Sequence, residues 1–179
     1  MTHFTKRGDE IVVWLEREFS GIRTGRATPA LLDLVSVESY GTRVPIQQVG
    51  SVSVEDARTL RVSVWDQSAI KNVERAITEA DLGVSVVTDS AGLRVIFPEL
   101  TSERRVQLIK LAKSKHEDAR ISVRTAREEA IKEMDRLEKD GDMSKDEKFA
   151  AKEDLQKKVD LYNTKLGDLM TLKEKEINS

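Results

Sequence analysis

The residues best suited to bind a ligand are cations that recur at helical spacing in the second half of the chain. Residues 101 to 132 hold nine Lys or Arg against five acids, whereas residues 133 to 179 hold ten against thirteen. On a helix that advances about 100° per residue, six basic side chains fall within an arc of roughly 100°. These six, termed the basic ridge, are Arg105, Lys113, His116, Arg120, Arg124 and Arg127. Such a row, about 30 Å long at 1.5 Å per residue, matches the phosphates of a nucleic-acid backbone, which arginine can bind through two hydrogen bonds.

The same arginines could instead pair with acids on neighbouring helices, which are plentiful in this sequence. Spacing alone does not choose between these two interpretations. No aromatic residue lies in the ridge to stack on an unpaired base. The pattern therefore favours a protein that recognises the nucleic-acid backbone or shape over one that reads single strands.

Other kinds of chemistry find little support. The absence of cysteine excludes disulfides, thiolate metal sites and cysteine nucleophiles. The two histidines, His3 and His116, are far apart in sequence, and the glycines do not form a nucleotide-binding loop. The carboxylates of the middle region are predicted to be solvated and not catalytic: Asp33, Glu38, Glu55, Asp56 and Asp66. We therefore expect no enzyme active site, no metal and no cofactor.

The overall charge gives no global signal for nucleic-acid binding. There are 30 Lys plus Arg against 32 Asp plus Glu, for a formal net charge of -2. The first residues do not form a basic-then-apolar leader, and no run of about 18 apolar residues occurs. We expect a cytoplasmic monomer that does not enter a membrane.

The middle of the chain has the pattern of short strands with one helix among them. Alternating apolar segments occur between residues 30 and 64, and again near 84–88 and 93–97. A helix is predicted to start at Ser68 and to stop at Gly83, which is suited to a left-handed cap.

Both ends of the chain have the periodicity of helices that bury one face. The predicted helices are residues 5–23, a long segment from the N-cap Thr101 to about Lys139, and another that starts at a capping box formed by Ser144 and Glu147. Three helices, each with one apolar face, bury these faces most simply by packing into a three-helix bundle.

Two breaks separate these regions. Residues 23–29 combine two arginines, a glycine and a proline, which ends a helix and redirects the chain, and a second break follows at Pro98. Residues 26–100 are thus predicted to form a domain inserted into a discontinuous bundle of residues 1–25 and 101–179. The predicted hinge consists of Arg23, Thr24, Gly25, Arg26, Pro29, Pro98, Leu100 and Thr101. We expect few packed side chains there.

Short motifs that occur in the same order along nearly the whole chain resemble the ribosome recycling factor family of bacteria. They are Ile22-Arg23-Thr24-Gly25-Arg26-Ala27, Tyr40-Gly41 with Pro45 and Gln48, Glu55-Asp56 with Arg58-Thr59-Leu60, Asp81-Leu82-Gly83, Pro98 with Leu100-Thr101, Glu103-Arg104-Arg105, Val123-Arg124 with Arg127, and Lys173-Glu174-Lys175-Glu176.

This resemblance implies an α+β, L-shaped two-domain protein of the size of a tRNA. The long arm would be the antiparallel three-helix bundle, and the short arm the inserted β/α/β domain. In the family, the bundle contacts ribosomal RNA of the large subunit at the A and P sites, and elongation factor G moves the short arm. Arg105, Arg124 and Arg127 would be RNA contacts, joined through the ridge by Lys113 and Arg120. The hinge would lie at residues 23–29 and 98–101.

The chain departs from the family pattern at Glu128, where many members have a second arginine. Because Glu128 points about 100° away from Arg127 on the helix, the ridge should survive. The resemblance implies a non-enzymatic factor that splits the post-termination ribosome with elongation factor G and GTP, and so releases mRNA and tRNA. A helical scaffold or RNA-binding adaptor without splitting activity is the alternative. An organelle-targeted relative is disfavoured by the lack of a transit segment.

Overall fold

The computed structural model describes residues 2–179. The chain divides into two compact units. The first unit comprises Met1–Phe19 and Ile109–Lys175, and the second comprises Ser20–Leu108 and Glu176–Ser179. The predicted domain boundaries, after residues 25 and 100, lie inside the second unit in this division, and they stay a prediction.

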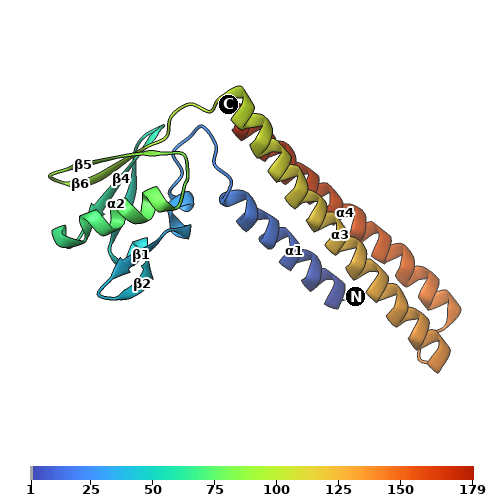
Figure 1. Cartoon of the computed structure of the whole chain (residues 1–179). Helices are drawn as coiled ribbons and strands as arrows, with labels where there is room; N and C mark the ends of the chain where they lie inside the picture. The colour runs from blue at the N-terminus through green and yellow to red at the C-terminus, as the bar shows by residue number, and fades with distance from the viewer. Residues whose placement is uncertain (1) are drawn as a thin grey trace. The chain divides into compact units, whose positions relative to one another are not determined.

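Three helices supply the first unit, and each extends by one or more residues into the second. They are α1, Thr2–Ser20, α3, Ser102–Asp140, and α4, Lys145–Asn178. The last two form a long antiparallel hairpin, and α1 lies along it (Figure 1). The side chains that face the common core are buried: Phe4, Ile11, Leu15 and Phe19 from α1, Ala112, Ala119, Val123 and Ala126 from α3, and Leu155, Val159, Tyr162 and Leu166 from α4. The prediction of an antiparallel three-helix bundle is confirmed.

The ends of these helices follow local hydrogen bonding. At the start of α3 the amide of Arg104 donates to Thr101 Oγ1 at 3.2 Å. At the start of α4 the Ser144 amide donates to Glu147 Oε2 at 2.8 Å, and the Glu147 amide donates to Ser144 Oγ at 3.2 Å. Both predicted caps are therefore present. None of the helices among residues 2–179 is both long enough and apolar enough to span a bilayer.

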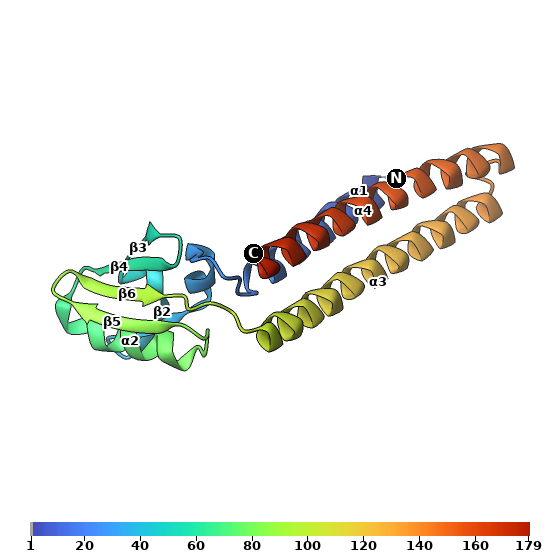
Figure 2. The same ribbon diagram turned by 90° about the horizontal axis from the view of Figure 1, so that it is seen from above.

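The second unit contains two antiparallel sheets and a helix. A hairpin is formed by β1, Ser36–Ser39, and β2, Thr42–Pro45. The larger sheet has the strand order β3-β4-β6-β5, with β3 Gly50–Asp56, β4 Thr59–Val64, β5 Ser85–Asp89 and β6 Gly92–Ile96. Helix α2, Ile70–Glu79, lies against one face of this sheet (Figure 2). The core of this unit includes Leu60, Val62, Val73, Ile77, Leu93, Val95 and Phe97.

Local turns account for the differences from the predicted elements. Pro29–Leu34 forms a 3₁₀-helix that the alternating pattern did not predict, with proline at its start. Two shorter 3₁₀ turns, Ile46–Gln48 and Gln67–Ala69, precede β3 and α2. Helix α2 ends at Glu79 and not at Gly83, because the chain tightens through a bond from the amide of Asp81 to the Thr78 carbonyl.

One further expectation about a helix end is also wrong. Helix α1 ends at Ser20, three residues before the predicted end, although Ile22 is still buried.

Candidate nucleic-acid interface

Three arginines of α3 meet two amide side chains of α4 in one groove of the first unit. The groove, termed the α3–α4 groove, has a volume of about 210 Å³. Its floor contains the buried side chains of Val123 and Val159. The polar groups around this floor are Arg120, Arg124 and Arg127 from α3, and Gln156 and Asn163 from α4. A cationic groove with an apolar floor can hold a phosphate while excluding part of its water.

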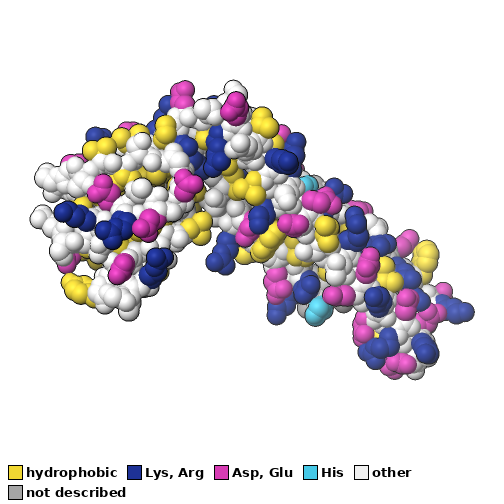
Figure 3. All heavy atoms as spheres, viewed as in Figure 1, with side chains coloured by type: hydrophobic (Ala, Val, Ile, Leu, Met, Phe, Trp, Pro, Cys, Tyr) yellow, Lys and Arg dark blue, Asp and Glu magenta, His cyan; other side chains and the backbone are white. Residues whose placement is uncertain are grey.

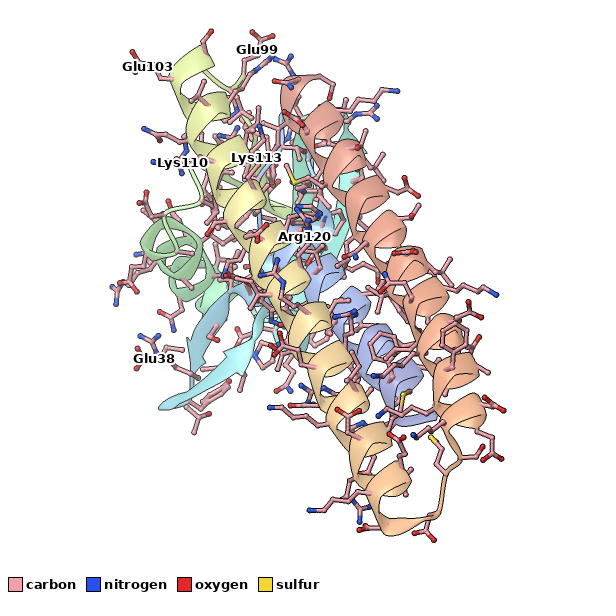
Figure 4. All side chains as sticks on the ribbon, turned by 90° about the vertical axis from the view of Figure 1, so that its right-hand side faces the viewer. Glu38, Glu99, Glu103, Lys110, Lys113 and Arg120 are labelled. Carbon is pink, nitrogen blue, oxygen red and sulfur yellow. The ribbon has the colours of Figure 1, made fainter. Side chains whose placement is uncertain are left out.

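The part of the ridge nearer the start of α3 lies on the same side of this helix as the groove. Figure 4 shows Lys113 and Arg120 on the side of α3 that is nearer α4, and Lys110 on the other side. Lys113 Nζ is 3.7 Å from Glu174 Oε1 of α4, and Arg120 Nη1 is 3.6 Å from Glu117 Oε2 of its own helix. All four side chains are at least 40% exposed, so both ion pairs are weak and can be exchanged for contacts with a ligand.

Two arginines of the groove, Arg124 and Arg127, pair with no acid among residues 2–179 that would neutralise their charge. Arg124 is exposed and makes no hydrogen bond or ion pair with another residue of the described chain. Arg127 is half-buried, and its Nε donates to Oε1 of Gln156 at 3.3 Å. Because the amide is neutral, it orients the guanidinium without cancelling its charge.

The arginine at the other end of the ridge is placed differently. Arg105 belongs to the second unit, where its Nη1 donates to the carbonyl oxygen of Asn178 at 2.9 Å. It also lines a pocket of about 260 Å³ together with Arg26, Arg58 and Ser179. The structure therefore brings Arg120, Arg124 and Arg127 into one groove, and Arg105 is not part of it.

His116 does not add to the charge of the ridge. Its ring is half-buried, and Nε2 has no hydrogen-bond partner among residues 2–179. Burial, and then the nearby charge of Arg120, lower the pKa of His116 below its usual value. The imidazole is accordingly neutral at pH 7.

The geometry argues against the interpretation that acids on neighbouring helices neutralise the ridge arginines. Within the described chain, the ridge of the first unit has one such pair, that of Lys113 with Glu174. By contrast, Arg136 further along α3 is held by Glu133 at 2.6 Å and by Asp140 at 3.5 Å. Charge density alone does not distinguish these cases, because cations and acids are interspersed over the helices on the face drawn in Figure 3. What distinguishes the groove is that acids are missing from its lining residues.

The predicted hinge segments are more closely packed than expected. The Arg23 guanidinium lies over the Phe97 ring, 5.7 Å from its centroid, and donates to the Pro98 carbonyl oxygen. Thr24 and Leu100 are buried. The expectation of few packed side chains is wrong for these residues. Gly25 is the exception, since a Cβ built there would meet no atom within 4 Å.

Comparison with known proteins adds independent information. The family model described as "Ribosome recycling factor" matches residues 15–177. The chain belongs to the ribosome recycling factor family.

Relatives in this family match nearly end to end. The ribosome-recycling factor of Rickettsia felis is 44% identical over 169 residues, which cover 94% of this chain and 91% of the relative. That of Bacillus velezensis is 41% identical over 177 residues, covering 99% and 96%. A solution structure of the ribosome recycling factor aligns with a TM-score of 0.77 at 39% identity, covering 98% of this chain and 94% of the other.

A second solved structure concerns the ribosome itself. It is described as models for the T. thermophilus ribosome recycling factor and the E. coli elongation factor G bound to the E. coli post-termination complex. This chain aligns with it at a TM-score of 0.67 and 37% identity, covering 98% and 95%. The recycling-factor fold is therefore shown for both units.

Gln156 and Asn163, which form the α4 side of the groove, were not predicted from the sequence. A helical wheel that is searched for basic residues alone does not reveal uncharged polar residues on another helix. Their spacing was nevertheless informative, because both lie within four positions of the core residue Val159, and they are seven positions apart. Positions seven apart lie on nearly the same face, beside the apolar stripe that faces α3.

Proposed function

We propose that this protein recycles ribosomes after termination, and that it binds the large ribosomal subunit through the α3–α4 groove and the adjoining ridge. With elongation factor G and GTP, it would promote separation of the subunits and release of mRNA and tRNA. The observation that carries the proposal is the set of three arginines in one groove without an acid among its lining residues. Family membership and the relative placed on a post-termination complex support the same function.

The proposed role is binding and mechanical action, and not catalysis. GTP hydrolysis would belong to elongation factor G, so the chain itself would need neither a cofactor nor a metal. It would act as a monomer in the cytoplasm. Lys113, Arg120, Arg124 and Arg127 would contact phosphates of ribosomal RNA, and Arg105 would join them if its bond to Asn178 opens.

The proposed hinge consists of the two connecting segments, residues 23–29 and 98–101. It comprises Arg23, Thr24, Gly25, Arg26, Pro29, Pro98, Leu100 and Thr101, between a bundle of residues 1–25 and 101–179 and an inserted domain of residues 26–100. The open space around Gly25 supports backbone freedom at that position. Segments of this type change their dihedral angles on the microsecond to millisecond scale.

Charge reversal at the groove tests the binding site. Arg127→Glu should weaken binding of the full chain to purified large subunits by at least about 10-fold, because a charged hydrogen-bond donor is replaced by a group that repels phosphate. The matched control is Arg136→Glu on the same helix, whose arginine is already paired with acids. It should bind nearly as the unchanged protein does. Co-sedimentation at several salt concentrations measures both affinities.

The activity itself is tested with post-termination ribosomes, elongation factor G and GTP, with subunit separation followed by light scattering. Separation that depends on the chain supports recycling. Binding of RNA without any separation would support the RNA-binding adaptor instead. Equal affinities of the Arg127→Glu and Arg136→Glu variants would remove the groove from the proposal.

A further inference from the structure

Gln156 of α4 stands between Arg127 and a carboxylate, in a chain of hydrogen bonds that has one consistent direction. Oε1 of Gln156 accepts from Nε of Arg127 at 3.3 Å. Nε2 of Gln156 donates to Oδ1 of Asp160, one turn further along α4, at 2.8 Å. A guanidinium can only donate and a carboxylate only accepts, so the amide has a single orientation that satisfies both neighbours. Asp160 therefore fixes the glutamine, and the glutamine fixes the arginine.

This chain of hydrogen bonds occupies the inner edge of the Arg127 guanidinium and leaves its outer edge available. Nε is used by Gln156, whereas Nη1 and Nη2 make no hydrogen bond or ion pair within residues 2–179. These two nitrogens carry the N–H groups that form a two-pronged contact with phosphate. An arginine that is held beforehand by Nε gives up less side-chain freedom when it binds.

An amide suits this task better than an acid. Arg136, which is held by Glu133 and Asp140, has its charge largely compensated. At Arg127 the glutamine stands between the cation and the acid. Asp160 contacts Gln156, and no ion pair links Asp160 to the Arg127 guanidinium in the described chain. The arrangement orients the cation and keeps its charge for a ligand.

We propose that Gln156 is a positioning residue for ribosome binding, which acts by orienting Arg127 toward an RNA phosphate while Asp160 anchors its amide. The inference rests on the proposed function, because it presumes that Arg127 contacts RNA. It extends that function to α4, whose polar side chains have no role in the predicted ridge.

The first test is a double-mutant cycle of the full chain binding to bacterial large ribosomal subunits. Gln156→Ala should weaken binding by about 2- to 10-fold, the range expected for ordering one long side chain. In the Arg127→Ala background the same change should have almost no effect, because the residue that it orients is gone. A loss of the same size in both backgrounds would overturn the inference, since Gln156 would then act directly or through the fold. No loss in the unchanged background would overturn it as well.

The second test separates orientation from charge. Asp160→Ala and Asp154→Ala each remove one acid from α4, and Asp154 pairs only with Lys158, at 3.1 Å, among the described residues. Electrostatic attraction alone predicts that both variants bind RNA slightly more tightly. The positioning role predicts that Asp160→Ala weakens binding while Asp154→Ala does not. Equal tightening by both variants would contradict it.

The third test uses salt dependence. In Gln156→Glu, the new carboxylate would pair with Arg127 and withdraw it from the phosphate, so the slope of log affinity against log salt should become shallower by about 0.7 to 0.9. An unchanged slope would count against the inference. Failure of the proposed function is distinguishable, because Arg127→Ala itself would then bind normally. If Arg127→Ala binds weakly and Gln156→Ala binds normally, only the positioning role is lost.

Discussion

At the scale of single residues, Tyr162 is a polar link between α1 and α4. Its hydroxyl shares its proton between the Thr5 carbonyl oxygen, at 2.9 Å, and Asp9 Oδ1, at 2.8 Å. Its ring meets Phe4 edge-on with centroids 5.9 Å apart, and the side chain is only 3% exposed. Burial first, and then the hydrogen bond with Asp9, raise the pKa of Tyr162 to about 12. The bundle is therefore stabilised by the neutral phenol.

This raised pKa predicts a loss of stability at alkaline pH. In the unfolded chain the phenol ionises near pH 10, while the folded protein keeps the proton to about pH 12. The stabilisation is complete below pH 10 and is lost as the pH rises to 12, by at most about 3 kcal/mol. Urea unfolding between pH 8 and pH 12 measures it. Tyr162→Phe should be less stable at pH 8, by about 1 kcal/mol for the lost hydrogen bond, and should decline less steeply above pH 10. Parallel curves would contradict the argument.

Gly8 of α1 allows the Tyr162 ring to approach the helix backbone. A Cβ at this position would lie 2.4 Å from two ring carbons. Gly8→Ala should therefore lower the unfolding free energy by about 1 to 3 kcal/mol through overpacking, in spite of the better helix propensity of alanine. Gly167→Ala in α4 is the matched control, since no atom lies within 4 Å of its Cβ, and it should raise stability by about 0.5 to 1 kcal/mol. Thermal unfolding compares the two variants, and a Gly8→Ala variant as stable as Gly167→Ala would refute the packing argument.

At the scale of elements, the turn between α3 and α4 is fixed by its cap. Ser144 and Glu147 satisfy each other's amides, and Gly141 takes a φ of +83° where the chain reverses. The hydrogen bonds from Ser144, through its amide and its hydroxyl, lower the pKa of Glu147. Ser144→Ala should cost about 1 kcal/mol of unfolding free energy, with little effect on groove binding. Chemical denaturation together with co-sedimentation checks both outcomes, and an unchanged midpoint would mean that the cap is dispensable.

The elements also show what the sequence can and cannot predict. The buried positions of α3 and the two caps were predictable because each depends on residues a few positions apart. The 3₁₀-helix at Pro29–Leu34 and the early end of α2 were not, since backbone geometry decides them after the apolar pattern is satisfied. The arginines of the groove were visible on one helical wheel. Gln156 was not, because its role depends on a partner on another helix.

At the scale of the whole molecule, the hinge proposal predicts different outcomes for two changes at one position. Gly25→Ala should recycle ribosomes normally, because a Cβ there meets no neighbour. Gly25→Pro should bind the large subunit but separate subunits more slowly, because proline fixes its own φ and restricts Thr24 before it. Light scattering with elongation factor G and GTP measures the rates. Normal separation by a folded Gly25→Pro variant would remove the hinge from the mechanism.

The discontinuity of the first unit has a consequence for its synthesis. Met1–Phe19 leaves the ribosome first, yet the rest of its unit, Ile109–Lys175, is translated only after almost the whole second unit. At a translation rate of about 5 to 20 residues per second, the apolar face of α1 stays exposed for several seconds, while residues 20–108 are already available to fold. Nascent chains arrested before and after α4 should differ accordingly in protease resistance at their N-terminal end. The helix that is made first in this chain is thus buried only when the helices that are made last arrive.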